Sequence, residues 1–475
     1  MNKIIKIFVI FTIIVNVING LAFPKHDELE STLDGSGSFP AQWFTQTLDH
    51  FNFQNNQTFQ QKYYVNDQYY NYQNGGPIIL YINGEGPVSS PPYSSDDAVV
   101  IYAQALNCMI VTLEHRFYGE SSPFSELTVE NLQYLSHQQA LEDLATFIVS
   151  YQNQLKNAGH IVTIGGSYSG ALSAWFRIKY PHITVGSIAS SGVVHAILDF
   201  TAFDSYLTVA GGPECTSALQ AVTAAVEKEY FAGSSNQQHI KQILQAEELT
   251  EIGDFFYWLA DSMAEGLQYG YYDELCYPLI DAINAGTTGI DLITLYSNYT
   301  INTWGKVLGT PDEYSTAWQQ NITYDPSKSA DRAWWYQTCS SLGWFQAAPS
   351  QNSIRSSMVN MTYFQTHCEQ LFGEGIWPNV NAVNLQYGGD QSNPLLNAAG
   401  SNILFTSGFS DPWTQASILK SNYPDVEPSI MTTCRKCGHC VDLRGCPGGC
   451  DLPNNLDQVR SYSLKLIATW LNINN

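Results

Sequence analysis

Short apolar runs recur along the first half of the chain, separated by stretches with polar and helical spacing. Four of these runs are rich in β-branched residues: Pro77 to Ile82, Met109 to Leu113, Ile161 to Ile164 and Val185 to Ala189. Continuous apolar runs of this length are typical of strands buried on both faces of a parallel sheet. Strands that alternate with helices in this way predict a doubly wound α/β domain.

One helix of this domain has a recognisable start. Ser136 and Gln139 form a capping-box-like pair before a run of apolar residues at helical spacing. The apolar residues are Ala140, Leu141, Leu144, Phe147 and Ile148. The pattern predicts a helix between the second and third strands.

The middle of the chain has a different pattern. Long helical stretches, such as Ser217 to Tyr230 and Glu247 to Glu265, stand among many aromatic residues. A strand-like run returns only at Ile403 to Thr406, and an amphipathic helix follows around Leu464 to Leu471. We therefore expect one α/β domain that is interrupted by a large, mainly helical insertion.

This division gives four parts. Residues 1–20 have the layout of a cleaved secretory signal, with Lys3 and Lys6 before the apolar run from Ile7 to Val15. A membrane anchor needs about 20 apolar residues, and two asparagines break this run. The expected α/β domain comprises residues 21–199 and 396–475, and the insertion comprises residues 200–395.

The net charge of the chain disfavours some classes of binding partner. The formal net charge of −23 disfavours nucleic acid and anionic membranes, which bind basic surfaces. An acidic balance also suits a low-pH compartment, although simple solubility explains it equally well. We expect a secreted, lysosomal or endosomal protein with no cofactor and no membrane contact after signal cleavage. A homodimer is left open.

A glycine-rich turn follows the third strand. In IVTIGGSYSG, Ser167 is preceded by Gly165 and Gly166, as a strained nucleophile elbow between strand and helix requires. Ser169 occupies the position where such elbows usually have glycine, and Gly170 follows it. The sequence therefore predicts Ser167 as a nucleophile, although many glycine-rich turns after strands are only turns.

A serine nucleophile needs an imidazole to accept its proton and a carboxylate to orient the imidazole. Asp411 follows the Ile403 to Thr406 run, and His439 follows a further short apolar stretch. The order Ser, Asp, His is the order found in α/β-hydrolase folds. An Asp before proline is also common in turns, and a lone His is more often structural, but order and strand context favour a catalytic triad.

The oxyanion of a tetrahedral intermediate needs fixed N–H donors. Tyr168, directly after the candidate nucleophile, is one expected donor. The loop after the first strand, with the sequence NGEGP, offers Gly84, Glu85 and Gly86 for the second.

These motifs, with others, resemble the family of lysosomal Pro-X carboxypeptidase, dipeptidyl peptidase II and thymus-specific serine protease. The shared segments are Gln46 to Asn52, Gly84 to Pro87, Glu114 to Pro123, Gly165 to Gly170, Trp335 to Cys339, Ser410 to Trp413 and His439 to Arg444. The resemblance implies an α/β-hydrolase fold with a helical insertion and a triad of Ser167, Asp411 and His439. It also implies peptide substrates, cleaved often next to proline and often from a chain end. Many members have a second His where this chain has Cys440.

Aromatic residues offer a pocket for an apolar proline ring. Trp413 stands beside the candidate Asp, and Trp334, Trp335 and Tyr336 lie in the expected insertion, where they could equally fill its core. Four Asn-X-Ser/Thr motifs are compatible with glycosylation on the secretory route. They are Asn56, Asn298, Asn321 and Asn360.

Five of the ten cysteines crowd around His439, at positions 434, 437, 440, 446 and 450. Their spacing is compatible with a zinc site, but a secreted chain favours local disulfides, so no metal is expected. Cys339 with Cys368, and Cys215 with Cys276, are plausible further pairs.

Two other functions use the same features. A lipase or esterase would share the triad and would cleave esters rather than proline-containing peptides. A non-catalytic binding protein of the hydrolase fold would not react with a fluorophosphonate at Ser167.

Overall fold

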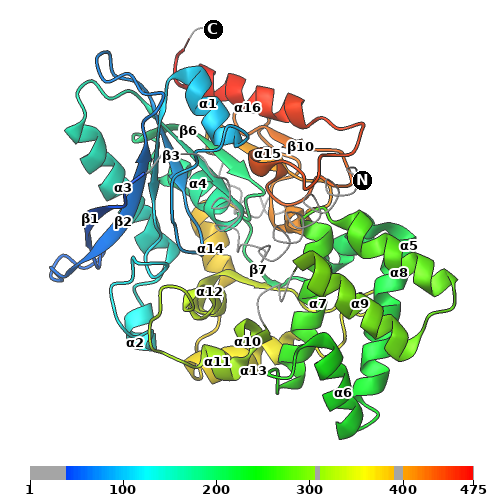
Figure 1. Cartoon of the computed structure of the whole chain (residues 1–475). Coiled ribbons are helices and arrows are strands. Elements are labelled where there is room, and N and C mark those ends of the chain that lie inside the picture. Colours follow the sequence, from blue (N-terminus) through cyan, green and yellow to red (C-terminus); the bar gives the residue numbers. More distant parts are fainter. Residues whose placement is uncertain (1–38, 305–310, 390–399, 474–475) are drawn as a thin grey trace, which may run out of the picture.

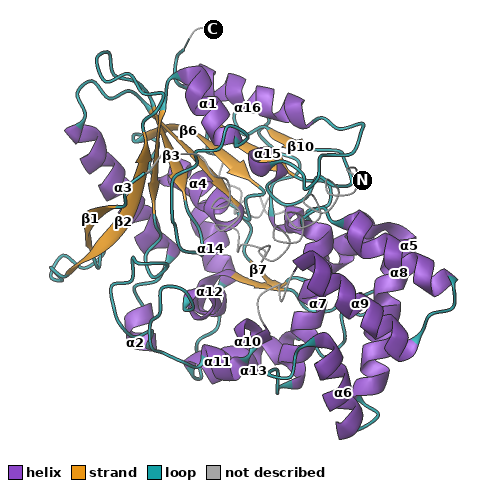
Figure 2. Cartoon of the chain, in the orientation of Figure 1, coloured by secondary structure: helices purple, strands orange, loops and turns teal. Residues whose placement is uncertain are grey.

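The computed structural model describes residues 39–304, 311–389 and 400–473. In this part of the chain, a central sheet has helices on both faces, and a further group of helices lies beside it (Figures 1 and 2). The expected signal segment at residues 1–20 and the expected end of the insertion near residue 395 lie outside the described residues.

The sheet has eight strands in the order β1-β2-β4-β3-β5-β6-β9-β10. The strands are β1 (Gln42–Thr47), β2 (Thr58–Asn66), β3 (Ile78–Ile82), β4 (Met109–Leu113), β5 (Ile161–Gly166), β6 (Thr184–Ser190), β9 (Ile403–Ser407) and β10 (Ser429–Met431). The pairs β1–β2 and β2–β4 are antiparallel, and every other neighbouring pair is parallel. The α/β fold class is confirmed, with every strand that the apolar runs predicted.

The pattern of apolar runs did not predict the β1–β2 hairpin at one edge of the sheet. These two strands are rich in Gln, Thr and Tyr, and much of their surface is partly exposed. Because an edge hairpin is only half buried, it does not produce the continuous apolar run of a central strand. The sheet is therefore mixed rather than fully parallel.

Alternating residues of the central strands bury both faces of the sheet. In β3, Ile78 and Leu80 belong to one buried cluster, whereas Ile79 and Tyr81 belong to another. The flanking helices are α1 (Ala98–Leu106) and α16 (Leu456–Trp470) on one face, and α3 (His137–Gln154) and α4 (Ser167–Lys179) on the other. As expected, the Ser136 hydroxyl accepts from the backbone N–H of Gln139 at the start of α3, at 3.2 Å.

The helices between β6 and β9 form the second group, coloured green to yellow in Figure 1. They are α5 (Thr201–Tyr230), α6 (Ser234–Leu244), α7 (Ile252–Gln268), α8 (Tyr272–Asn284), α9 (Gly289–Trp304), α10 (Pro311–Tyr314), α11 (Thr316–Gln319), α12 (Ala330–Gln337), α13 (Met361–Phe372) and α14 (Val380–Tyr387). Two short strands, β7 (Ile197–Asp199) and β8 (Gly343–Phe345), pair with each other in this region. The remaining short elements are α2 (Val129–Leu132), α15 (Val441–Arg444), the π-helix Thr338–Leu342 and the 3-10 helix Pro412–Ala416.

Two insertion helices differ from their expected limits. The pattern from Glu247 predicted a helix, but α7 begins only at Ile252, because Glu251 is extended and the residues before it turn after α6. Helix α5 starts at Thr201, well before the predicted start at Ser217, and bends at Gly212, where φ is +67°. Among the described residues, no helix has the length and apolar character needed to cross a lipid bilayer.

Candidate active site

Ser167 stands at the turn from β5 into α4. Its φ is +57°, a left-handed conformation that costs free energy for a residue with a side chain. Two glycines close to Ser167 in sequence have no room for a side chain. A Cβ on Gly165 would lie 2.2 Å from the carbonyl oxygen of Ser169, and one on Gly170 would lie 2.8 Å from that of Ser190. This geometry is that of a nucleophile elbow.

Ser169 explains why the elbow tolerates a departure from the usual glycine. Its buried hydroxyl donates to the carbonyl oxygen of Gly166 at 2.6 Å and accepts from the N–H of the same residue at 3.1 Å. A serine here therefore satisfies two backbone groups that a glycine would leave to other partners. The departure is compatible with the elbow and gives it an additional internal link.

Asp411 and His439 lie together in the interior. Oδ1 of Asp411 is 2.9 Å from Nδ1 of His439, and both side chains are almost fully buried. Oδ1 of Asp411 also accepts from the backbone N–H of Trp413 at 3.0 Å, which fixes the carboxylate. Burial alone lowers the pKa of His439, but the charge of Asp411 and the sulfur of Cys440 raise it, and the net pKa lies above the ordinary value. The pair therefore favours an imidazolium, the form that a general base takes after accepting a proton.

The loop that contains His439 is fastened to β6, the strand next to the elbow. The backbone N–H of Cys440 donates to the hydroxyl of Ser191 at 2.9 Å, and the Ser190 hydroxyl donates to Asp442 at 2.5 Å. Since β6 pairs with β5 up to the last residue before Ser167, these contacts hold His439 at the same edge of the sheet as the elbow. Nothing in the sequence pattern indicated these roles for the two serines or for Asp442.

The insertion also holds His439. The backbone carbonyl of Gln268, the last residue of α7, accepts from the N–H of His439 at 2.7 Å. The side-chain oxygen of the same glutamine accepts from the indole N–H of Trp413 at 3.0 Å. The end of α7 thus contacts both loops that supply the candidate acid and base.

The two expected sources of oxyanion donors lie next to each other. A Cβ on Gly84 would have Ser169 atoms at 3.7 Å and a ring carbon of Tyr168 at 3.8 Å as its nearest neighbours. The loop with Gly84, Glu85 and Gly86 therefore packs directly on the elbow. Which backbone N–H groups stabilise an oxyanion remains a prediction.

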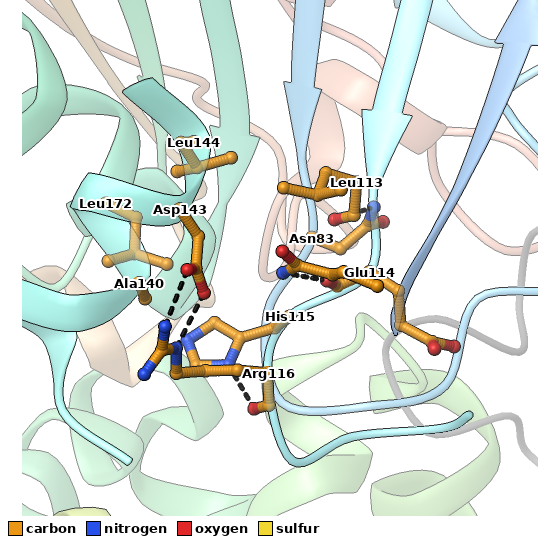
Figure 3. Close-up of a pocket in the computed structure, with 10 residues that line it drawn as sticks. Asn83, Leu113, Glu114, His115, Arg116, Ala140, Asp143, Leu144 and Leu172 are labelled. Carbon is orange, nitrogen blue, oxygen red and sulfur yellow. Dashed lines mark hydrogen bonds and ion pairs between the residues drawn. The ribbon is translucent and has the colours of Figure 1, made fainter. Parts of the chain in front are cut away.

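Polar side chains, among them Asn83, Asp143 and those of Glu114 to Arg116, line a small cavity (Figure 3). The hydroxyl of Tyr168 accepts from the amide of Gln337 at 2.8 Å and lies 3.2 Å from Nε2 of His115. Next to His115, Arg116 donates from Nε and Nη2 to the two carboxylate oxygens of Asp143, both at 2.6 Å. His115 and Arg116 are therefore both held by hydrogen bonds within the fold.

The aromatic residues expected in a pocket fall into two groups. The ring centroid of Trp334 lies 5.5 Å from that of Tyr168. The ring of Trp344 lies between Trp334 and Trp413, with its centroid 5.9 Å from that of Trp334 and 6.1 Å from that of Trp413. In contrast, Trp335 packs against His367, and Tyr336 against Phe372, inside the insertion. The structure therefore brings Trp334 and Trp413 to the site and places Trp335 and Tyr336 in the core.

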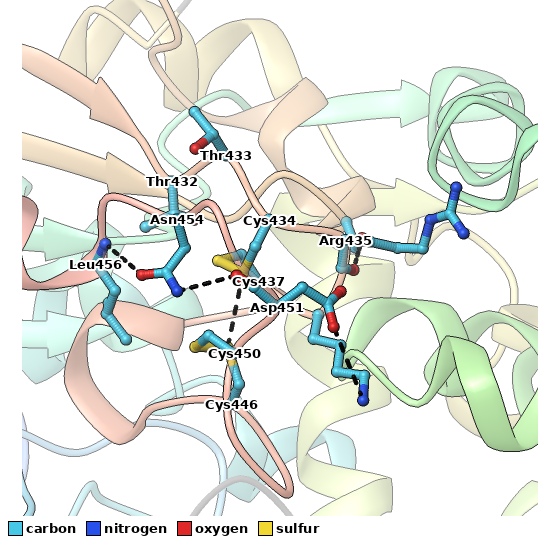
Figure 4. The surroundings of a disulfide bond; sticks show 12 residues. Thr432, Thr433, Cys434, Arg435, Cys437, Cys446, Cys450, Asp451, Asn454 and Leu456 are labelled. Atoms are coloured by element: carbon cyan, nitrogen blue, oxygen red, sulfur yellow. Dashed lines mark hydrogen bonds and ion pairs between the residues drawn. A yellow bond between two sulfur atoms is a disulfide. The ribbon is translucent and has the colours of Figure 1, made fainter.

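Four disulfides are present among the described residues. The pairs are Cys215–Cys276, Cys339–Cys368, Cys434–Cys437 and Cys446–Cys450. The last two lie side by side before and after His439, with all four sulfurs within 4.8 Å of one another (Figure 4). Sulfurs in disulfides cannot supply the thiolates that zinc needs.

The Cys434–Cys437 loop also joins the two candidate catalytic loops. The carbonyl of Cys437 accepts from the N–H of Ser410 at 2.9 Å, next to Asp411. Cys440 and Cys108 take no part in a disulfide. The four candidate glycosylation sites have exposed side chains: Asn56, Asn298, Asn321 and Asn360.

Comparison with known proteins is informative over most of the chain. The sequence pattern of the family described as serine carboxypeptidase S28 matches residues 46–449. The chain belongs to this family. Membership makes it a serine peptidase, and so an enzyme. The match includes all three residues of the candidate triad.

Curated relatives agree with this assignment. The chain is 40% identical to "Probable serine protease EDA2" of Arabidopsis thaliana, over 90% of this chain and 88% of the relative. It is 28% identical to the thymus-specific serine protease of Mus musculus, over 86% and 84% of the two chains. It is 26% identical to the lysosomal Pro-X carboxypeptidase of Homo sapiens, over 90% and 88%.

Proposed function

We propose that this peptidase is an exopeptidase that cleaves next to proline and forms an acyl-enzyme on Ser167. The main support is the buried Asp411–His439 pair, 2.9 Å apart, at the sheet edge where Ser167 begins α4. The match to the serine carboxypeptidase family and the Pro-X carboxypeptidase relatives support the same assignment.

The proposed reaction has two halves. The Ser167 hydroxyl attacks the scissile carbonyl carbon while His439 takes its proton, and Asp411 stabilises the resulting imidazolium. The N–H of Tyr168 and one from the Gly84 to Gly86 loop receive the developing oxyanion. The C–N bond then breaks, and His439 returns the proton to the leaving amine. Water repeats these steps on the ester and releases the second product.

A preference for proline is supported by the aromatic side chains at this site. Trp334 and Trp413 are both partly exposed, so their rings are available to an apolar pyrrolidine. We also propose that the protein works in the lysosomal lumen or outside the cell. This location accords with the name of the Pro-X carboxypeptidase relatives and with the disulfides.

The test is digestion of a proline-containing peptide library by the wild type and by Ser167→Ala, with products identified by mass spectrometry. We expect terminal fragments cut next to proline from the wild type, none from the variant, and fluorophosphonate labelling of the wild type only. Equal digestion by Ser167→Ala, or cleavage of esters without cleavage of any peptide, would refute the proposal.

A further inference from the structure

Two disulfides lie against each other (Figure 4), one before and one after His439 in the sequence. The inner pair is Cys434 and Cys437, and the outer pair is Cys446 and Cys450. We call these four residues the cysteine cluster. Sγ of Cys434 is 3.9 Å from Sγ of Cys446, and all four sulfurs lie within 4.8 Å of one another. Two separate segments of the chain therefore bring their sulfurs to one point.

The cysteine cluster has the spacing of a zinc site. Zn²⁺ binds four thiolates at about 2.3 Å in a tetrahedron, which places neighbouring sulfurs about 3.8 Å apart. The distance between Sγ of Cys434 and Sγ of Cys446 matches this separation. Both pairs also have the sequence spacing of zinc ligands, C-x2-C and C-x3-C. Because the Cα atoms of each pair are 5.0 Å apart, rotation of the side chains can bring the sulfurs of an opened pair to the same separation.

Apolar side chains cover the buried side of the cysteine cluster. Val441 and Leu456 pack against the inner pair, and both are buried. An apolar shell limits the access of water to a metal site. Four sulfurs also leave no coordination position for water or substrate, so the arrangement is that of a structural rather than a catalytic metal site.

Reduction can begin at the outer pair, which is partly exposed, whereas the inner pair is buried. A dithiol donates two electrons and two protons to the outer disulfide and itself becomes a disulfide. Sγ of Cys446 lies 3.9 Å from Sγ of Cys434, so its thiolate can attack there, form a Cys434–Cys446 bond and release the thiolate of Cys437. A second dithiol then reduces the new bond. Two dithiols therefore convert the cysteine cluster into four thiols.

We propose that the cysteine cluster is a redox-dependent metal site: once both disulfides are reduced, its four thiolates bind one Zn²⁺ ion. Zinc suits a tetrahedral set of sulfurs, and sulfurs as close as these enclose a single ion. Each thiol loses its proton to solvent when the ion binds. In the disulfide form the cluster supplies no thiolate and binds no metal. The inference goes beyond the proposed peptidase reaction, which uses neither a reductant nor zinc.

Zinc would join two segments that the disulfides leave separate. Each disulfide links cysteines only three or four residues apart, so neither fixes one segment to the other. A metal bound by the whole cluster links the segment before His439 to the segment after it. The first segment also contacts the Asp411 loop, since the carbonyl of Cys437 accepts from the N–H of Ser410 at 2.9 Å. The zinc form should therefore hold the loop of the proposed base at least as firmly as the disulfide form.

The test measures metal binding after reduction. The protein is treated with dithiothreitol under native conditions, the reductant is removed anaerobically, and thiols are counted by alkylation and mass spectrometry. Co²⁺ is then added at neutral pH as a spectroscopic probe, followed by Zn²⁺. The two disulfides of the insertion join fully buried cysteines and should stay closed.

Two double variants replace either the inner pair or the outer pair by serine. Cys440→Ser is the control, because its thiol lies in the same loop but outside the cysteine cluster, with Sγ 3.8 Å from the carbonyl oxygen of Ser190. Far-UV circular dichroism reports whether each reduced protein remains folded.

We expect reduction to expose the four thiols of the cysteine cluster and to create a site for one Co²⁺ per chain. Its spectrum should contain a thiolate-to-cobalt charge-transfer band and the d–d bands of tetrahedral Co²⁺. Zn²⁺ should displace Co²⁺, because it gives up no ligand-field energy in a tetrahedral site. Cys440→Ser should bind metal as the wild type does. Both double variants and the oxidised wild type should lack the charge-transfer band, since a tetrahedral site needs all four thiolates.

Three results would overturn the proposal. A folded, reduced protein with the four thiols free and no charge-transfer band would show that the cysteine cluster does not hold a metal. Retention of the band by either double variant would assign the metal to other ligands. Disulfides that resist the dithiol in the folded protein would refute the dependence on redox state. Fluorophosphonate labelling of Ser167 in the oxidised protein is unaffected by all three results, so the proposed function is tested separately.

Discussion

The charge of Asp411 is expected to determine how firmly His439 holds a proton. The carboxylate is fully buried, 2.9 Å from Nδ1 of the imidazole. In Asp411→Asn the side chain keeps its shape, and its oxygen can still accept from the N–H of Trp413. The variant therefore removes the charge while retaining the contact that caps the following 3-10 helix.

The size of the effect follows from the contact. An opposite charge this close raises a histidine pKa by about 1–3 units, or about 1.4–4 kcal/mol. The loss in kcat should be larger, about 10⁴-fold, the size found when asparagine replaces the aspartate of a serine peptidase triad, because the neutral amide no longer stabilises the imidazolium of the transition state. That factor corresponds to about 5.5 kcal/mol of transition-state stabilisation.

The assay is kcat/KM for a proline-containing peptide as a function of pH, for the wild type and Asp411→Asn. The acidic limb of this profile reports the pKa of the general base in the free enzyme. Since Asp411 raises the pKa of His439 and burial lowers it, removing the charge should move the acidic limb to lower pH.

The same pKa shift affects stability. A histidine whose pKa is raised by folding stabilises the fold fully below its unfolded pKa of about 6.5, and this contribution disappears as pH rises through the folded pKa. Asp411→Asn should therefore lose more thermal stability at pH 5 than at alkaline pH. An acidic limb that stays in place or moves upward, or a kcat within about threefold of the wild type, would refute this reasoning.

Three further predictions concern the elbow and the insertion. Ser169→Ala should lower the free energy of unfolding by about 1–3 kcal/mol, measured by urea denaturation, because the backbone groups of Gly166 lose their buried partner; an unchanged midpoint would contradict this. Gly170→Ala should cost about 1–3 kcal/mol through backbone overlap, whereas Gly84→Ala, which has space for a Cβ, should change stability by less than about 0.5 kcal/mol. Equal melting temperatures for these two glycine variants would count against the packing described here. Removing the disulfide of α5 and α8, which joins cysteines 61 residues apart, should cost about 4 kcal/mol, and calorimetry of the double Cys-to-Ser variant would reveal any smaller loss.

The central fold could be predicted because each of its strands is buried on both faces. A continuous apolar run such as Met109–Leu113 is stable only where both of its faces are buried, and the structure has a strand at each of these runs. The edge hairpin was missed because its residues are half exposed. The start of α7 was placed too early because Glu247 to Glu251 are compatible with helical spacing, while the turn after α6 depends on contacts that the sequence alone does not reveal.

The candidate triad could be proposed because its residues follow strands in a recognisable order. The groups that hold the triad could not, because they are joined only by tertiary structure. The Gln268 carbonyl accepts from the backbone N–H of His439, and the Ser191 hydroxyl accepts from that of the next residue. Neither Gln268 nor Ser191 stands in a motif that indicates this role.

The hydrogen bond from His439 to the end of α7 gives the insertion a direct part in positioning the proposed base. The insertion supplies Trp334, which is proposed to contact the proline of the substrate, and the end of its helix α7 also holds the backbone of the proposed base in place. Changes in specificity and in catalysis are therefore not independent in this enzyme. An insertion transplanted from a relative would have to preserve the carbonyl of Gln268 at its original position, and chimeras that shift the end of α7 should lose turnover before they gain a new preference.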